Sequence, residues 1–505
     1  MGEGEFSDVL RARSPRFMGS KREPSLGKFS PRPQGVTPKT AQTGVLKNLV
    51  VLVQFPDLAA THTRQEFEAL FNTIGYNADK AQGSVKDYFR EVSYNALTVD
   101  SVVTDWVTLD HGYAYYGTND VNGDDLRPEE MVQEALAKLA ATGFDFSTLD
   151  ADNDGWVDSL TVIHAGGGAE FGGNNPNYIW SASGAMPSAV TYHGKKMQNY
   201  QTEAERRGWD SLPSSWGLTR IGVICHETGH LLGLPDLYDP AYASKGLGNF
   251  CLMAGGNWNG DAGTQPAHMS AWCKKTLGWI TPTVAMSGGI FTVPRVEDNP
   301  TLYQLNGSFP SSQYFLIENR QGYGFDAGLP GSTRGLLIYH VDEDQPDNSD
   351  CTHDKVDLEE ASGVQDLELN RNSGDDADYY RQGHNTSLTS NSTPNNLSYA
   401  GMPLGLEIVS VSASGPSMTF TIAALPAPSA DLFLAISDVP GPHGMVELSF
   451  LTLLGRTYRL EFTDSLRPIS WLPLTNSVAG TGASIQVRDP AVATRTTRFY
   501  RLVVE

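Results

Sequence analysis

Apolar and polar positions in the first part of the chain alternate in the manner of a mixed α/β domain. Residues 49–55 form a β-branched apolar run that ends in Pro-Asp, which is typical of a buried strand. Residues 127–141 have apolar positions at helical spacing and acidic residues in the first turn, where these complement the helix dipole. Further strands are predicted at 97–103 and 159–164, and further helices at 63–73, 84–92 and 218–232. This alternation predicts an α/β lobe with a mixed sheet.

After residue 281 the pattern changes to short strand-like runs separated by Gly, Pro and Asn turns. Such runs, without intervening helical patterns, are typical of an all-β region. We therefore expect a β-sandwich over residues 282–425. The clearest predicted strands lie at 289–293, 314–318, 335–340 and 417–422.

The end of the chain forms a further unit. Residues 426–430 have the Pro-rich and Ala-rich composition of a linker. Beyond them, apolar residues alternate at Tyr458, Leu460 and Phe462, which predicts a small β-sandwich module over 426–505. Adhesion to a surface, recruitment of substrate and service as a cleaved sorting tag all stay open as its role.

Composition and charge narrow the classes of function. The chain has 505 residues, which is too long for one ordinary domain. Its net charge of −22 argues against a nucleic-acid partner, because phosphate backbones select basic surfaces. No apolar stretch reaches the ~18 residues of a transmembrane helix.

The strongest chemical signal is the segment CHETGHLLGLPD, which begins at Cys225. His226 and His230 lie four residues apart, so on a helix both imidazoles project from one face toward a single ion. Glu227 lies between them, where it would polarise a metal-bound water and not ligate the metal. This spacing predicts a catalytic zinc site with its own general base.

The residues after the two histidines strengthen this interpretation. Gly233 tolerates the positive φ angles that end helices, so the chain is expected to turn sharply there. That turn would bring Asp236 back as a third zinc ligand and leave a fourth position for water or substrate. The alternative is a chance occurrence of the short pattern on an ordinary helix. The spaced Gly and Asp and the apolar run at 221–224 argue against chance.

Several separate segments resemble one known family in the same order along the chain. The segments HETGHLLGLPDLYD, GLGNFCLMAGGNWNG and PAHMSAWCKKTLGWI resemble the immune inhibitor A (M6) family of secreted bacterial metallopeptidases. KNLVVLVQFPD, SVKDYFREVSYNALTV and DADNDGWVDSLTVIHAG resemble it before the zinc helix, and YFLIENRQGYGFDAGLPG and GLLIYHVDED after it. The resemblance covers residues 46–425.

The resemblance implies a multidomain α+β architecture. It implies a metzincin-like zinc peptidase catalytic domain over 46–281, followed by the β-sandwich domain and the C-terminal all-β module. In this family a methionine turn lies beneath the metal, and Met253 is the matching residue here. The implied substrates are proteins or peptides, and the implied location is outside the cell.

The expected mechanism is that of a zinc metalloendopeptidase. Zinc held by His226, His230 and Asp236 lowers the pKa of its bound water toward neutrality. Glu227 takes the proton of that water as it attacks the scissile carbonyl and returns it to the leaving amine. The donor that shares stabilisation of the oxyanion with zinc is not fixed by the sequence, and Tyr238 and Tyr242 are candidates.

Two rival functions stay in view. One is a catalytically inactive adhesin of the same fold, in which zinc is structural. The intact Glu227 argues against it, since a structural site has no use for a base. The other is a zinc hydrolase that acts on another bond, such as an amide in a glycan.

Residues 1–45 are rich in Arg, Lys, Pro and Ser and are expected to be extended or disordered alone. Their start lacks the apolar core of a secretory signal. An expression remnant with a linker and the tail of a pro-segment that covers the active site are both open. No cysteine precedes Cys225, so this segment supplies no thiolate to the zinc.

A second signature resembles the opening of a calcium loop. Carboxylates at positions 1, 3, 5 and 9, with Gly155 at position 6, would wrap a hard cation. Val162 stands where a complete EF-hand has Glu, so the alternative is an Asp-rich turn. Acidic clusters at 342–350 and 375–378 are weaker; a solvated loop is favoured for each, and calcium is the alternative. The predicted calcium ligands are Asp150, Asp152, Asp154, Trp156 and Asp158.

Cysteines and histidines outside the motif carry less information. Cys225, Cys251 and Cys273 would lie close together in the family fold, and a disulfide among them and buried free thiols are both open. His164, His340 and His353 are candidates for groups that support the metal ligands, although a purely structural role is favoured for each.

Overall fold

The structure is a computed structural model. It describes residues 42–121, 123–171, 175–208, 217–285, 288–424, 434–439, 445–452, 456–465, 470–481, 483–489 and 497–504. Most of the predicted N-terminal extension and the predicted linker at 426–430 lie outside these described residues.

A six-stranded mixed sheet forms the centre of the first part of the chain. Its strand order is β2-β1-β4-β6-β5, with β3 paired to β1 beyond the end of β2. The pairings are parallel except for the hairpin of β5 and β6, which is antiparallel. The predicted mixed sheet is therefore confirmed. The strands are β1 (Gly44–Gln54), β2 (Leu97–Val103), β3 (Val107–Thr108), β4 (Ser159–Gly167), β5 (Ala182–Tyr192) and β6 (Lys195–Arg206).

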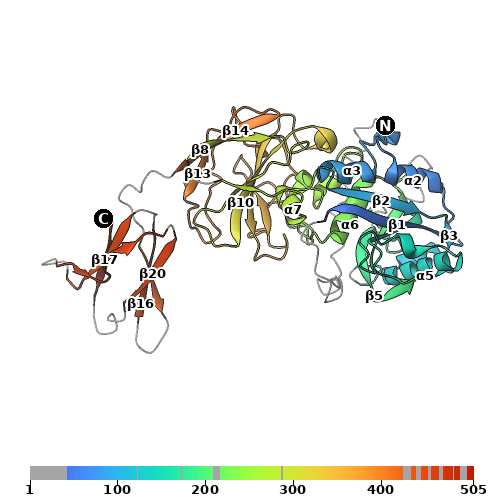
Figure 1. The fold of residues 1–505 in the computed structure, drawn as a ribbon, viewed down its shortest axis with the longest axis horizontal. Helices are drawn as coiled ribbons and strands as arrows, with labels where there is room; N and C mark the ends of the chain where they lie inside the picture. Colours follow the sequence, from blue (N-terminus) through green and yellow to red (C-terminus); the bar gives the residue numbers. More distant parts are fainter. Residues whose placement is uncertain are drawn as a thin grey trace.

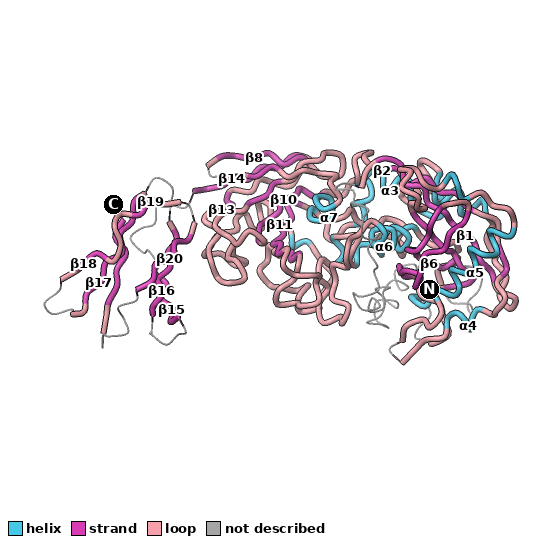
Figure 2. Tube along the Cα trace, turned by 60° about the horizontal axis from the view of Figure 1, so that its bottom comes forward, coloured by secondary structure: helices cyan, strands magenta, loops and turns pink. Residues whose placement is uncertain are grey.

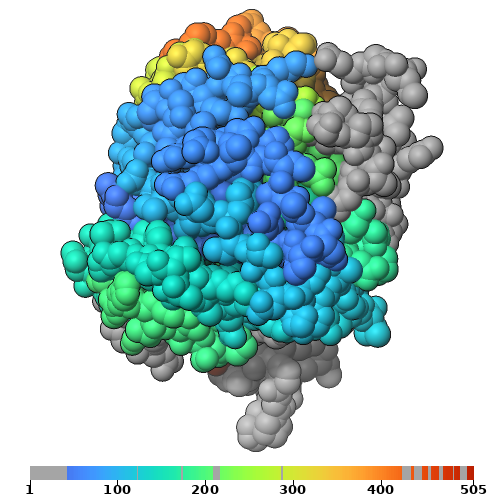
Figure 3. All heavy atoms as spheres, turned by 90° about the vertical axis from the view of Figure 1, so that its right-hand side faces the viewer, coloured from blue at the N-terminus to red at the C-terminus, as the bar shows by residue number. Residues whose placement is uncertain are grey.

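Helices cover both faces of this sheet (Figure 1). Along β1, Leu49 and Val51 pack in one cluster with α5, while Val50 and Leu52 pack in another with α2, α3 and α6. This period of two buries both faces, so residues 49–53 of the strand are all apolar. Figure 3 shows one outer face of this part, where atoms of the blue and cyan segments make up most of the surface. The helices are α2 (Arg64–Asn72), α3 (Val85–Val92), α4 (Tyr113–Gly117), α5 (Pro128–Ala141), α6 (Ile221–Leu231) and α7 (Ala271–Thr276).

Local capping explains why two predicted helices begin where they do. Thr63 caps α2 and Ser84 caps α3, and each is reciprocated by a carboxylate three residues later in a capping box. Both helices therefore begin one residue after the predicted start, directly after the cap.

The next part of the chain consists of two sheets that enclose an apolar cluster. One sheet has the order β12-β11-β10-β9-β7 and the other β13-β14-β8. Phe315 and Ile317 of the first sheet pack with Met418 and Phe420 of the second. Figure 2 shows that strands and loops make up most of this part. The strands are β7 (Thr283–Val284), β8 (Gly289–Pro294), β9 (Tyr303–Leu305), β10 (Gln313–Arg320), β11 (Gly335–Asp342), β12 (Val356–Leu358), β13 (Leu406–Val409) and β14 (Ser417–Ala424).

One hydrophobic cluster runs across the expected domain boundary at residue 281. It joins Met253 and Trp272 to Leu316 of β10 and to Tyr339 of β11. The two-sheet part therefore shares a core with the segment that follows α6. The boundary at this residue stays a prediction, but the two parts are not packed as separate cores.

The remaining described strands form two small sheets with their own apolar cluster around Leu448, Tyr458 and Leu460. Among the residues that the structure describes, no helix has the length and apolarity to cross a membrane. The strands are β15 (Ala435–Val439), β16 (Met445–Leu451), β17 (Thr457–Thr463), β18 (Leu472–Pro473), β19 (Val478–Ala479), β20 (Ser484–Asp489) and β21 (Phe499–Val504).

Candidate active site

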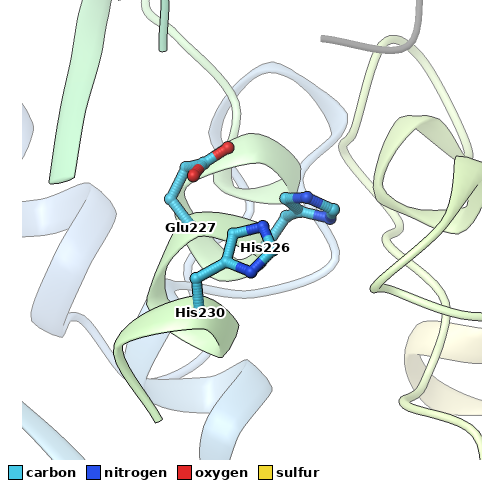
Figure 4. Close-up of side chains that lie close together, drawn as sticks. All are labelled: His226, Glu227 and His230. Atoms are coloured by element: carbon cyan, nitrogen blue, oxygen red, sulfur yellow. The ribbon is translucent and has the colours of Figure 1, made fainter. Parts of the chain in front are cut away.

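Helix α6 presents two histidines on one side and a glutamate beside them (Figure 4). The rings of His226 and His230 lie 4.9 Å apart between centroids and are nearly perpendicular. One potential ligand atom from each of His226, Glu227 and His230 lies within 4.8 Å of the others. All three side chains are buried. The predicted helical arrangement is therefore present.

Backbone carbonyls fix the orientation of both rings. His226 Nδ1 lies 2.8 Å from the carbonyl oxygen of Leu252, and His230 Nδ1 lies 2.9 Å from that of Leu234. A carbonyl only accepts hydrogen bonds, so Nδ1 of each ring must be the donor. In the neutral ring this assigns the lone pair to Nε2, the atom suited to bind a metal.

The exit from the helix brings a carboxylate to the same point. Gly233 has φ of +98°, and its N–H donates to the carbonyl of His230 over 2.8 Å. The chain then turns back so that Asp236 Oδ1 lies 3.1 Å from His226 Nε2 and 3.3 Å from His230 Nε2. The left-handed turn predicted at Gly233 and the return of Asp236 are both present.

The residues at this point fit a zinc ion. Asp236 Oδ1 is buried and has no hydrogen-bond partner among the described residues. Although burial alone would raise it, the two imidazoles hold the pKa of Asp236 below its usual range, so the carboxylate is ionised. In the neutral tautomer described above, two nitrogen lone pairs and this anionic oxygen would converge on one point. A divalent cation satisfies this set, and two His nitrogens with one carboxylate oxygen are ligands that zinc accepts.

Met253 packs directly beneath this turn of the helix. A Cβ atom placed on Gly229 would lie only 2.4 Å from Met253 Sδ, so glycine at this position permits the close approach. Met253 is fully buried, and its carbonyl accepts from the N–H of Leu237 over 2.7 Å. The segment that holds Met253 thus contacts both the helix and the returning chain.

Two buried carboxylates beside Glu227 were not identified from the sequence. Burial raises the pKa of Glu227, and burial together with Glu227 raises the pKa of Glu170 to about 7. Burial, Glu227 and Glu170 raise the pKa of Glu203 well above its usual range. The hydroxyl of Ser181 donates to Glu170 over 2.8 Å. Glu227 therefore lies among acids that stay protonated up to near-neutral pH or beyond it.

Glu205, next but one to Glu203 on β6, has a different role. Its carboxylate accepts from the N–H groups of Thr61, His62 and Gly166. This carboxylate therefore links the backbone of the glycine-rich end of β4 to the segment that holds Thr61 and His62.

The two candidate oxyanion donors lie next to each other. The ring of Tyr238 lies 6.4 Å from that of His226 and 6.3 Å from that of Tyr242, on which it stacks. The hydroxyl of Tyr238 is buried without a hydrogen-bond partner among the described residues. Tyr238 therefore faces the metal ligands, and its role as donor stays a prediction.

The other histidines have local partners. His164 Nδ1 lies 3.1 Å from the carbonyl oxygen of Ala165. His340 and His353 both lie against Tyr399, with ring centroids 4.4 and 3.8 Å away. These contacts support the structural role that the sequence favoured for each.

The predicted calcium loop brings three of its carboxylates together. Asp150, Asp152 and Asp158 each place an oxygen within 4.8 Å of the others. Two neighbouring amides and the ammonium of Lys195, at 2.7 Å, bind the carboxylate of Asp150. Burial raises the pKa of Asp158 to about 6, with a contribution from Asp152 and Asp150. Lys195 therefore neutralises part of the negative charge of this loop. Calcium binding at the loop stays a prediction.

The cysteines are all free. Ser270 donates through its N–H to Cys251 Sγ and through its hydroxyl to Cys273 Sγ, over 3.3 and 3.4 Å. Cys225, Cys251 and Cys273 are buried. The structure therefore agrees with buried thiols and not with a disulfide.

Comparison with known proteins finds similarity to one family over the part of the chain that holds this site. Residues 36–280 match the model of the immune inhibitor A peptidase M6 catalytic domain. The chain is 34% identical over 228 residues to immune inhibitor A of Bacillus thuringiensis subsp. alesti, a match that covers 38% of this chain and 32% of that protein. It is 28% identical over 305 residues to the pre-pro-metalloprotease PrtV of Vibrio cholerae, which covers 51% of this chain and 33% of that protein.

The chain spans about a third of the length of these curated relatives. Among solved structures, wild-type OgpA from Akkermansia muciniphila aligns with 91% of this chain and 96% of its own, at 11% identity. Its TM-score of 0.27 is too low to support an argument about fold.

Proposed function

We propose that the chain is a zinc metalloendopeptidase, because residues 36–280 match the immune inhibitor A peptidase M6 catalytic domain. Its substrates would be proteins or peptides. The observation that carries the proposal is the convergence of His226 Nε2, His230 Nε2 and Asp236 Oδ1 beside the carboxylate of Glu227.

His226, His230 and Asp236 would hold the metal. When bound there, zinc would supply the Lewis acidity that activates water and stabilises the developing oxyanion. The carbonyls of Leu252 and Leu234 keep each imidazole in the tautomer that binds a metal through Nε2. An anionic third ligand would make this site less Lewis-acidic than one built from three neutral histidines.

Glu227 would move the proton. A carboxylate oxygen of Glu227 accepts the proton of the attacking water as the C–O bond forms, and then delivers it to the amine nitrogen as the C–N bond breaks. Burial raises the pKa of Glu227, which suits a group that must both accept and return a proton near neutral pH. Tyr238, whose hydroxyl is buried near the ligands, is the candidate for a second contact to the oxyanion.

Further features belong to the same proposal. The catalytic part would have a metzincin-like fold with Met253 beneath the metal, supported by its close packing on Gly229. The chain would act outside the cell, as the family resemblance implies. Calcium bound by the loop from Asp150 to Asp158 would stabilise that loop. The C-terminal module would bind a surface or a substrate.

Cleavage of an unfolded protein substrate tests the proposal. The wild-type chain and Glu227→Gln are compared at equal bound zinc, which separates loss of the base from loss of the metal. Cleavage by the wild type and none by the variant supports the assigned role of Glu227. Equal activity in both contradicts the mechanism.

The same experiment addresses the rival functions. An inactive adhesin would cleave nothing in either form, including after removal of residues 1–45, which tests latency. A glycan amidase would act on a glycan substrate and leave unfolded protein intact.

A further inference from the structure

The loop between β11 and β12 carries an asparagine that is fully buried, although the segment around it is acidic. Asn348 is 0% exposed. Its amide pairs with both backbone groups of Val356: the N–H of Val356 donates to Oδ1 over 3.1 Å, and Nδ2 donates to the carbonyl oxygen of Val356 over 2.8 Å. Because the N–H of Val356 needs an acceptor, this pairing fixes the orientation of the amide. The second hydrogen of Nδ2 is therefore available to another segment.

That second hydrogen bonds to the segment that carries the third predicted zinc ligand. Asn348 Nδ2 donates to the carbonyl oxygen of Leu237 over 3.3 Å. Leu237 also donates through its own N–H to the carbonyl oxygen of Met253 over 2.7 Å. Leu237 stands between Asp236 and Tyr238, so the hydrogen bonds on its two sides fix the backbone of both neighbours.

The carbonyl oxygen of Leu237 is held closely from a second side. The N–H of Leu247 donates to this oxygen over 2.9 Å. Gly246 has φ of +50°, and a Cβ atom on it would overlap the same oxygen. Each of the two donors uses one lone pair of the carbonyl. Loss of the Asn348 amide would therefore leave one side of this peptide group free to turn.

Three more hydrogen bonds hold the segment after Leu237 against loops of the two-sheet part. Two join backbone groups, and one joins an asparagine amide to a backbone carbonyl. They run from Lys245 N–H to Leu367 O over 2.9 Å, from Asn249 N–H to Ser373 O over 2.8 Å, and from Asn370 Nδ2 to Tyr242 O over 2.8 Å. Like Asn348, the partners at 367–373 lie outside residues 36–280, which match the peptidase family. Residues beyond the matched region thus anchor this wall of the candidate active site.

We propose that Asn348 is a positioning residue for the zinc site, because it holds the Leu237 carbonyl and thereby keeps Asp236 and Tyr238 beside the two histidines. This inference rests on the proposed zinc peptidase function. A ligand binds a metal well only when surrounding hydrogen bonds hold it in the ligand geometry. Asn348 acts through the backbone and is not itself a ligand.

Replacing the amide by an apolar group of similar shape tests this role. Asn348→Leu removes the hydrogen bonds without adding a charge near the site. The matched control is Asn396→Leu, in the same two-sheet part. Asn396 is 1% exposed, and its amide donates to the carbonyl of Leu406 over 2.6 Å. Because that bond stays within the two-sheet part, its loss should lower stability and leave the zinc site unchanged.

Metal binding is measured on the full chain in the Glu227→Gln background, which prevents self-cleavage. In competition with a chelator, Asn348→Leu should bind zinc about 10-fold more weakly than its parent, and Asn396→Leu should stay within about twofold of it. Cobalt(II) in place of zinc gives a second readout, because its visible absorption bands depend on the geometry of the ligands. These bands should shift in Asn348→Leu alone. Zinc affinity and cobalt bands that are the same in Asn348→Leu and its parent overturn the proposal.

Thermal unfolding with and without zinc separates positioning from folding. A purely structural asparagine lowers the melting temperature equally in both forms, whereas a positioning residue also reduces the rise that zinc produces. That rise should be smaller in Asn348→Leu than in its parent and unchanged in Asn396→Leu. If Asn348→Leu does not fold, Asn348→Ala takes its place, since the smaller side chain leaves room for water at the unpaired groups. An unchanged rise in the variant that folds overturns the proposal.

Peptidase kinetics keep this inference distinct from the proposed function. With Glu227 intact and zinc saturating, Asn348→Leu should lower kcat more than it changes KM, because a contact from Tyr238 to the oxyanion forms only in the transition state. A wild-type chain that binds zinc and cleaves nothing contradicts the proposed function, while weaker zinc binding by Asn348→Leu still supports the positioning role. Cleavage by the wild type, with the same zinc affinity in Asn348→Leu, overturns the positioning role and leaves the proposed function in place.

Discussion

Met253 Sδ occupies the space that a side chain at Gly229 would need. A Cβ at that position would lie 2.4 Å from the sulfur, inside the closest approach of real atoms. Gly229 lies one residue before His230, so this contact fixes the distance between the ligand-bearing turn and the segment beneath it. Gly229 is part of the sequence motif, and the close approach of Met253 explains why glycine stands at this position.

Substituting Gly229 by Ala tests this contact. Alanine favours the helix by about 1 kcal/mol, but overpacking against a buried side chain costs about 1–3 kcal/mol. We therefore expect a net loss of stability of up to about 2 kcal/mol in urea unfolding of the zinc-loaded protein. Met253→Ala leaves a cavity and costs about 2–5 kcal/mol alone. Because the methionine is what crowds the alanine, the double variant should cost less than the sum of the two. Additive losses would mean that the two residues do not press on each other.

Asp236 should be essential for zinc affinity. Asp236→Asn keeps the shape of the side chain but removes the negative charge that faces both imidazole Nε2 atoms. Loss of this ligand charge should weaken zinc binding by more than the ~10–100-fold typical of changes around the ligands. A competition titration against a chelator measures this affinity.

The matched control for Asp236 is Asp239→Asn. Asp239 is equally buried, but it accepts from the N–H groups of Ala241 and Ala243 and does not face the histidines. Its substitution should destabilise the loop and leave zinc affinity within a few-fold of the wild type. Equal losses of zinc from the two variants would remove the reason to regard Asp236 as a ligand.

Glu170 should make stability depend on pH. Burial raises its pKa from 4.5 to about 7, so the folded protein holds a proton that the unfolded chain releases at lower pH. The stabilisation is therefore complete below the unfolded pKa and is lost as the pH rises through about 7. Between about pH 5 and pH 7, the free energy of unfolding of the wild type should fall by about 2–3 kcal/mol relative to that of Glu170→Gln. Urea unfolding of both proteins across this range measures the gap, and a gap that does not change with pH contradicts the prediction.

The sequence predicted elements whose cause is local. Helices α2 and α3 begin directly after their caps, Thr63 and Ser84, because each cap and its reciprocating carboxylate lie within four residues. Residues 49–53 of β1 are apolar throughout because both faces of the strand are buried there. The ligands on α6 were predicted because four-residue spacing places them on one face of any helix.

The hairpin of β5 and β6 escaped prediction because its burial is polar. Gln201, Thr202, Glu203 and Glu205 are all buried on β6, so the strand lacks the apolar alternation that marks other strands. Their partners come from distant segments: Glu205 accepts from the N–H of Thr61, and the amide of Gln201 donates to the hydroxyl of Thr161. A cavity in the two-sheet part escaped for the same reason, since residues 351–368, residues 393–401 and His340 line it together. Residues that meet from distant segments have no regular spacing along the sequence, so a sequence pattern does not predict their contacts.

Arg320 should hold the methionine turn in place from the neighbouring sheet. This fully buried guanidinium binds both oxygens of Asp326 over 2.7 Å and donates to the carbonyl of Phe250 over 3.0 Å. Asp326 in turn accepts from the N–H of His268, whose carbonyl accepts from the N–H of Leu252. Leu252 is the residue that orients His226, so the charged network reaches the metal ligands through two backbone links.

Substituting Arg320 by Met tests this connection. The change leaves Asp326 and Glu318 buried without their cation, which should cost about 3–5 kcal/mol in urea unfolding. Zinc affinity should fall as well, because Leu252 loses its anchorage. The control is Arg295→Met, which breaks a more exposed pair with Asp298 and should change stability by about 0–1 kcal/mol. Adding Asp326→Asn and Glu318→Gln to Arg320→Met should recover part of the loss, because the uncompensated charges are then removed. A stability loss that leaves zinc affinity unchanged would show that the network supports the fold without reaching the metal ligands.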